Sequence, residues 1–147
     1  EWRLLRQLRA WGLLVPTPVA ARYQRAGLFY RADLITAELP VRRTLAQALQ
    51  QASLPDGTWH AIGRCVGSLH ARGVQHADLN AHNLLVGASN DIYVLDFDRG
   101  RIRARGEWER AVLARLQRSL WKVTTDLPAR RFTDAHWQAL LAGAGTD

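Results

Sequence analysis

The chain has 147 residues, of which 48% are hydrophobic and 22% are charged. This balance predicts one compact domain with a packed core and excludes a chain that is disordered throughout. The single cysteine, Cys65, excludes an internal disulfide, and no apolar run is long enough to predict a membrane-spanning helix. The formal net charge of +7 favours an anionic partner, although codon usage that favours arginine would give the same charge.

The beginning of the chain predicts a helix followed by a small sheet. Apolar residues recur with helical spacing over residues 2–11, which predicts an amphipathic helix that ends near Gly12. Residues 19–24 and 28–35 predict two strands, which a hairpin turn at residues 25–27 would join.

The rest of the chain is expected to be mostly helical. Helices are predicted at residues 45–51, 58–71, 107–122 and 134–141. Thr44 and Thr133 stand where they can cap the first and the last of these helices. Residues 84–86 and 92–95 predict a short second hairpin between the helices. This order of elements indicates an α+β fold.

The most informative motif is His76-Ala77-Asp78-Leu79-Asn80-Ala81-His82-Asn83, which Asp96-Phe97-Asp98 follows after a predicted strand. An H-x-D-x-x-x-x-N sequence with a later aspartate at a strand end is the layout of a phosphotransferase site. Asp78 is the candidate base that would orient and deprotonate an attacking hydroxyl. Asn83 and Asp96 are candidate ligands of Mg²⁺, which prefers hard oxygen donors. Each residue alone would more often belong to a turn or a cap, so the ordered set carries the prediction.

Other residues with possible functions are less informative. His82 could contact a substrate, but a solvated or backbone-bonded side chain fits the sequence equally well. His76 is expected to hold the loop by hydrogen bonding, and the histidines with Cys65 show no zinc spacing. Most tryptophans fall on predicted helices, where burial is commoner than base stacking, so nucleic-acid binding is not expected.

At these residues the chain resembles the 3-deoxy-D-manno-octulosonic acid (Kdo) kinases, a bacterial branch of the protein-kinase superfamily. The resemblance is carried by the segments Leu69 to Asn83 and Val94 to Gly100, and it extends over residues 12–18, 29–36 and 115–122. It implies a protein-kinase-like fold that is mostly the helical C-lobe, with a partial N-lobe truncated at its N-terminus. Residues 1–37 would form the partial N-lobe, with a helix, the last strands and the hinge. Residues 38–147 would form the C-lobe with the catalytic loop.

The resemblance also implies an activity. Such an enzyme would use ATP and Mg²⁺ to phosphorylate the 4-hydroxyl of Kdo in Kdo-lipid A during lipopolysaccharide core biosynthesis. Because this acceptor is an anionic glycolipid, the protein would work peripherally on the cytoplasmic face of the bacterial inner membrane. The arginine cluster formed by Arg99, Arg101 and Arg103 would suit an anionic surface, although a solvated strand edge would explain it as well. Heptose or aminoglycoside kinases and a non-catalytic kinase-like binding module are the alternatives.

Several site residues follow from the resemblance position by position. Asp78 matches the catalytic base, and Asn83 and Asp96 match the metal ligands. Glu1 matches the small-lobe glutamate that pairs with the lysine of the nucleotide site. The hinge that meets adenine through backbone groups falls on three residues, Thr36, Ala37 and Glu38.

The chain also departs from the protein-kinase pattern. Its only lysine, Lys122, lies in a predicted helix beyond Asp96 and cannot hold nucleotide phosphates, and no G-x-G-x-x-G is present. We therefore expect that the first strands of the small lobe are missing and that the chain alone is inactive. Asn80 and Asp98 stand where protein kinases commonly have lysine and glycine, which favours a glycolipid acceptor over a protein acceptor.

Overall fold

The computed structural model describes residues 1–27, 29–41, 43–127 and 129–145. Its elements are α1 (Trp2–Ala10), β1 (Pro18–Ala26), β2 (Phe29–Thr36), α2 (Leu45–Gln51), α3 (Asp56–Ala71), β3 (Val74–Gln75), β4 (Leu84–Val86), β5 (Ile92–Val94), β6 (Arg101–Ile102), α4 (Trp108–Thr124) and α5 (Asp134–Ala144). Helices and small two-stranded antiparallel sheets alternate along the chain, which confirms the α+β class. Within these residues, no helix combines the length and the apolar content needed to cross a membrane.

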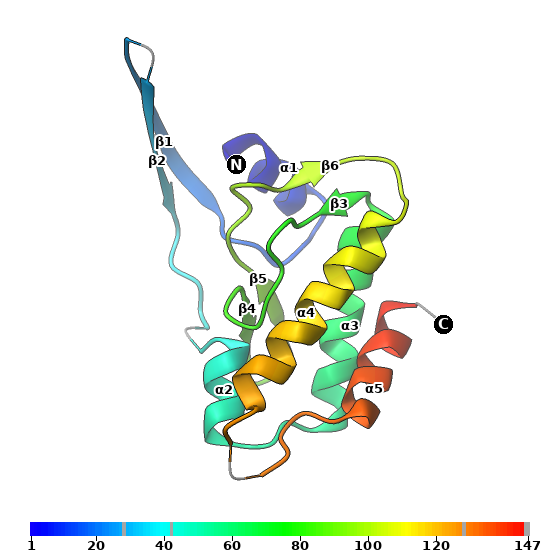
Figure 1. Cartoon of the computed structure of the whole chain (residues 1–147). Helices are drawn as coiled ribbons and strands as arrows, with labels where there is room; N and C mark the ends of the chain where they lie inside the picture. The colour runs from blue at the N-terminus through cyan, green and yellow to red at the C-terminus, as the bar shows by residue number, and fades with distance from the viewer. Residues whose placement is uncertain (28, 42, 128, 146–147) are drawn as a thin grey trace.

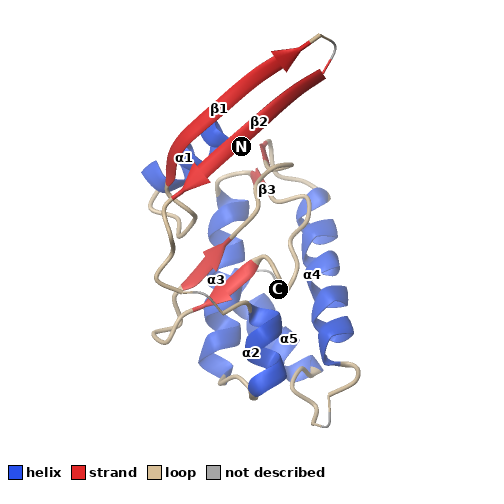
Figure 2. Ribbon diagram, turned by 90° about the vertical axis from the view of Figure 1, so that its left-hand side faces the viewer, coloured by secondary structure: helices blue, strands red, loops and turns tan. Residues whose placement is uncertain are grey.

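The hairpin formed by β1 and β2 extends away from the helical body (Figures 1 and 2). The two strands pair in antiparallel register, with an irregularity between Pro18 and Ala20. Both strands match the prediction, except that Leu28, the expected start of the second strand, lies outside the described residues. Apolar side chains on the hairpin are largely exposed, as Tyr23 (66%) and Phe29 (81%) show.

The helical body shares one hydrophobic core with α1, so the first helix packs on the segments that carry the motif. The fully buried side chains include Leu5, Leu8, Leu45, Leu49, Trp59, Ile62, Leu69, Leu116 and Leu140. Trp59, Trp108 and Trp137 are buried as the sequence predicts. Trp121 is an exception, since its side chain is 40% exposed although its ring contacts Phe132 edge-on.

Two predicted helix caps are confirmed by hydrogen bonds. The Thr44 hydroxyl accepts a bond from the N–H of Gln47, and the Gln47 side chain accepts one from the N–H of Thr44, which completes a capping box. The Thr133 hydroxyl accepts a bond from the N–H of His136 at the start of α5. The prediction for α3 was two residues short, because Pro55 is the N-cap and the helix begins at Asp56.

Sequence periodicity did not reveal the small sheet of β3 and β6. Each strand has two residues, which is too short for a pattern of alternating side chains to appear. Val74 pairs with Ile102 and Gln75 with Arg101. Gly73 has φ +68°, and a Cβ there would overlap the carbonyl oxygen of Arg103, so a glycine is needed for this approach. The sheet joins the entrance of the motif loop to the segment that follows Asp96.

Burial of His70 makes the stability of the fold dependent on pH. The side chain is only 6% exposed and packs edge-on against Trp108, with ring centroids 5.1 Å apart. Desolvation lowers the pKa of His70 below its usual value, an effect that Glu109 opposes and Arg105 reinforces. The unfolded chain therefore takes up a proton at a higher pH than the folded chain does.

We expect the free energy of unfolding to fall as the pH drops below the unfolded pKa of about 6.5, by at most about 1.4 kcal/mol per pH unit for this group. The loss ends below the folded pKa. Urea denaturation at pH 7.5 and 5.5 measures the change in the free energy of unfolding. His70→Leu should make the difference between the two pH values smaller. His60→Gln removes an exposed histidine from the same helix and serves as the control. An unchanged difference in His70→Leu would contradict the assignment.

Candidate active site

His76 joins the motif loop to the end of β5. Its Nε2 donates a hydrogen bond to the carbonyl oxygen of Leu95 at 2.8 Å, and its Nδ1 accepts one from the N–H of Asp78 at 3.3 Å. These two bonds require the neutral ring with its proton on Nε2. The ring is 2% exposed and lies edge-on to Phe97. Both nitrogens therefore hold the backbone, as the sequence predicts, and neither is left for proton transfer.

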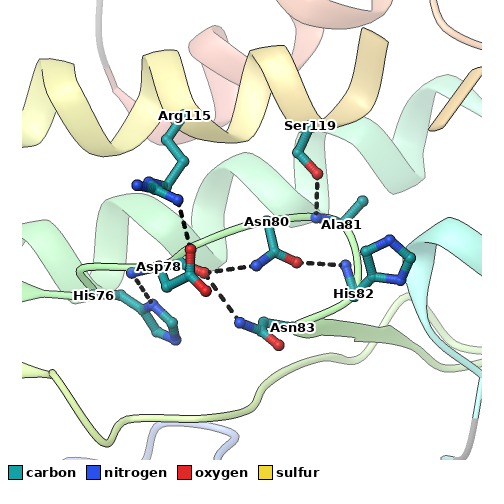
Figure 3. Close-up of polar contacts among 8 residues, drawn as sticks. All are labelled: His76, Asp78, Asn80, Ala81, His82, Asn83, Arg115 and Ser119. Atoms are coloured by element: carbon teal, nitrogen blue, oxygen red, sulfur yellow. Dashed lines mark hydrogen bonds and ion pairs between the residues drawn. The ribbon is translucent and has the colours of Figure 1, made fainter. Parts of the chain in front are cut away.

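The loop from Asp78 to Asn83 is folded on its own side chains (Figure 3). The carbonyl oxygen of Asp78 accepts bonds from Nδ2 of Asn80 at 2.9 Å and Nδ2 of Asn83 at 3.0 Å. Oδ1 of Asn80 accepts a further bond from the N–H of His82 at 2.8 Å. Because Asn83 uses its amide nitrogen for the loop, its amide oxygen stays available as a metal donor.

Asp96 is brought to this loop by the backbone. The N–H of Leu95 donates to the carbonyl oxygen of Asn83 at 2.8 Å, so Asn83 and Asp96 lie on neighbouring segments. Asp96 has φ +59°, a left-handed conformation that costs a non-glycine residue about 1 kcal/mol or more. Such strain is commonest at functional sites, where it aims a side chain.

The donors fit Mg²⁺ better than a metal that needs a closed protein cage. An amide oxygen and a carboxylate are hard ligands, and Mg²⁺ usually completes its shell with water and substrate phosphates. Over the described part of the chain, no three residues of the His, Cys, Asp or Glu types lie close enough to hold a metal ion.

The residues predicted for the nucleotide side are only partly connected to this loop. Oε1 of Glu1 accepts a bond from the N–H of Phe97 at 3.2 Å, so Glu1 lies beside the Asp96 segment. Thr36, Ala37 and Glu38 are exposed residues at and just beyond the end of β2. The N–H of Ala37 donates to the carbonyl oxygen of Thr17 at 2.8 Å and cannot also bind adenine.

Two residues of α4 that were given no role from the sequence contact the loop directly (Figure 3). Nη1 of Arg115 lies 2.6 Å from Oδ1 of Asp78, and Oγ of Ser119 accepts a bond from the N–H of Ala81 at 3.0 Å. The ion pair is half-exposed, so it adds little stability but orients the carboxylate. The spacing of four residues, which places Arg115 and Ser119 on one helix face, is the only sequence signal for them. That spacing alone does not predict that these two residues contact the motif loop.

A carboxylate, an amide and a second carboxylate lie on one loop-and-strand unit, which is the arrangement expected of a phosphotransferase-type site. The chain belongs to the lipopolysaccharide kinase (Kdo/WaaP) family, whose model matches residues 1–143.

Proteins described as 3-deoxy-D-manno-octulosonic acid kinases are similar to this chain over most of its length. One from Photobacterium profundum is 42% identical over 143 residues, which cover 97% of this chain and 60% of the relative. One from Pasteurella multocida is 40% identical and covers 97% of this chain and 61% of the relative. One from Xylella fastidiosa (strain M12) is 43% identical over 124 residues, which cover 84% of this chain and 49% of the relative. The chain thus spans less than two thirds of the length of these relatives.

Proposed function

We propose that the full-length protein transfers the terminal phosphoryl group of ATP to the 4-hydroxyl of Kdo in Kdo-lipid A, a step of lipopolysaccharide core biosynthesis. The observation that carries this proposal is the placement of Asp78, Asn83 and Asp96 on one hydrogen-bonded unit. Membership of the Kdo/WaaP family supports the acceptor class. Residues 1–37 would form the partial N-lobe, and residues 38–147 would form the C-lobe, which carries the proposed base and the metal ligands.

The acceptor side derives its chemistry from Asp78. The hydroxyl oxygen of the sugar attacks the terminal phosphorus, the bond to the bridging oxygen breaks, and ADP leaves. The proton of the hydroxyl passes to the Asp78 carboxylate. Because Arg115 binds Oδ1, the carboxylate is held in one orientation and Oδ2 remains for the hydroxyl.

The nucleotide and metal side rests on six residues. Asn83 and Asp96 would hold Mg²⁺, which neutralises phosphate charge when it is bound. Glu1, beside Phe97, would orient the lysine of the nucleotide site. The hinge backbone at Thr36, Ala37 and Glu38 would meet adenine, with the carbonyl of Ala37 as acceptor, since its N–H is already bonded.

The protein would work at the cytoplasmic face of the bacterial inner membrane as a peripheral protein. Arg99, Arg101 and Arg103 line a surface hollow of about 480 Å³, which Asp98 and Ala77 also line, next to the motif loop. All three arginines are exposed, and the formal net charge of the chain is +7. Basic side chains near a surface of anionic lipid each contribute about 1 kcal/mol to binding.

The experiment is phosphoryl transfer to Kdo-lipid A held in anionic vesicles, with the full-length protein and labelled ATP. We expect one phosphate to be added to Kdo, and none to be added to vesicles of lipid A without Kdo. In the same samples, the protein should sediment with the vesicles at low salt and less at high salt. Transfer to heptose or an aminoglycoside in preference to Kdo would overturn the proposed acceptor.

A further inference from the structure

A second hollow is lined by residues of the motif loop, of α2 and of the C-terminal half of α4. The C-terminal end of α4 lies near α2 (Figure 1). It measures about 540 Å³ and is lined by Gln50, His82, Arg118, Ser119, Lys122, Val123, Asp126 and Leu127. The role proposed for Asp78, Asn83 and Asp96 leaves this hollow unexplained.

The hollow adjoins the motif loop, and two contacts connect them. His82 belongs to that loop, four residues after Asp78, and forms part of the wall. Ser119, another wall residue, accepts a hydrogen bond from the N–H of Ala81. One turn before Ser119 on α4, Arg115 holds the Asp78 carboxylate. A molecule seated in the hollow would therefore lie beside the proposed base.

The charge of the hollow is unbalanced. Arg118 and Lys122 are four residues apart on α4, where like charges repel each other. Among the residues that the structure describes, neither forms an ion pair or a side-chain hydrogen bond. Asp126 is the one carboxylate in the wall, and it forms no ion pair with Lys122. The wall thus contains two exposed cationic side chains and one carboxylate, and Val123 and Leu127 make it partly apolar.

We infer that this hollow is the anion subsite of the acceptor, in which Arg118 and Lys122 bind a carboxylate or phosphate group of the glycolipid. The inference rests on the proposed function, whose acceptor class it deepens. A guanidinium can bind either anion through two parallel hydrogen bonds, and an ammonium adds a third donor group. The apolar wall would accommodate the sugar ring or the base of an acyl chain.

The test compares acceptor kinetics in the full-length protein. Arg118→Gln and Lys122→Gln should each raise the KM for Kdo-lipid A about tenfold or more, because each loses a charge-assisted hydrogen bond. The kcat and the KM for ATP should change little. Arg118→Lys should restore part of the affinity. Arg110→Gln is the matched control, since Arg110 carries the same charge on the same helix outside the hollow.

Two acceptors distinguish the source of the anion. If the group is a lipid A phosphate, the increase in acceptor KM that Arg118→Gln causes should be smaller with a Kdo-lipid A that lacks one phosphate. If the group is the Kdo carboxylate, Arg118→Gln should raise the acceptor KM by the same factor with both acceptors. Either result supports the subsite, and wild-type acceptor KM values in both glutamine variants would overturn it.

Calorimetric titration with Kdo-lipid A micelles in the absence of ATP separates this inference from the proposed function. Wild-type protein that binds the acceptor but does not phosphorylate it would overturn the proposed function alone. Weaker binding by Arg118→Gln would then still support the subsite. Equal binding by the wild type, Arg118→Gln and Lys122→Gln would overturn it.

Discussion

In the full-length protein, replacing Asp78 by asparagine is expected to lower the rate of phosphoryl transfer to Kdo-lipid A by about 10²- to 10⁴-fold, the range that a general base contributes. The asparagine amide has nearly the same shape, but it cannot accept the hydroxyl proton and it loses the ion pair with Arg115. The loop should survive the change, because Asn80 and Asn83 bind the backbone carbonyl of residue 78 and not its side chain. Initial rates with labelled ATP measure the effect.

Asp91→Asn is the control for this experiment. Asp91 is an exposed carboxylate in the β4–β5 turn, where its carbonyl oxygen accepts the N–H of Gly87 and its side chain forms no ion pair with the described residues. Its replacement should leave the transfer rate within about twofold, since surface substitutions usually perturb a protein little. Wild-type transfer by Asp78→Asn would remove Asp78 from its proposed role.

Gly63→Ala is expected to lower the free energy of unfolding by about 3 kcal/mol or more, at the upper end of the overpacking range. A Cβ on Gly63 of α3 would overlap the carbonyl oxygen of Leu140 in α5. The obstacle is backbone, so no side-chain rotation relieves it and the two helices must separate. Gly143 makes the reciprocal approach, because its Cβ would overlap the carbonyl oxygen of His60. Urea denaturation followed by circular dichroism measures the loss.

Gly57→Ala is the matched control on the same helix. A Cβ there would have Nδ2 of Asn90 as its nearest neighbour, at 3.9 Å, which is ordinary van der Waals contact. Alanine has the higher helix propensity, so Gly57→Ala should be neutral or stabilising by up to about 1 kcal/mol. If Gly63→Ala were as stable as Gly57→Ala, the close approach of α3 and α5 would be wrong.

Local features of the fold were predictable because their causes lie within a few residues. The Thr44 hydroxyl caps α2 by accepting a bond from Gln47, only three residues away. The apolar pattern that predicts α1 repeats with each helical turn. The spacing of the motif also allows Asn83 to bond to the backbone carbonyl of Asp78, five residues before it. These interactions are set by covalent spacing, so they do not depend on how distant segments pack.

The sequence by itself thus determined the α+β class, the bounds of most elements and the membership of the Kdo/WaaP family that its motif indicated. The tertiary structure decided which residues join that motif from elsewhere. Arg115 reaches Asp78 across 37 residues, and the N–H of Phe97 reaches Glu1 across 96. Arg118 and Lys122 share a hollow with His82 because α4 lies along the motif loop. Such neighbours follow from the packing of helices on one core, and helical periodicity predicts which face is buried but not which segment covers it.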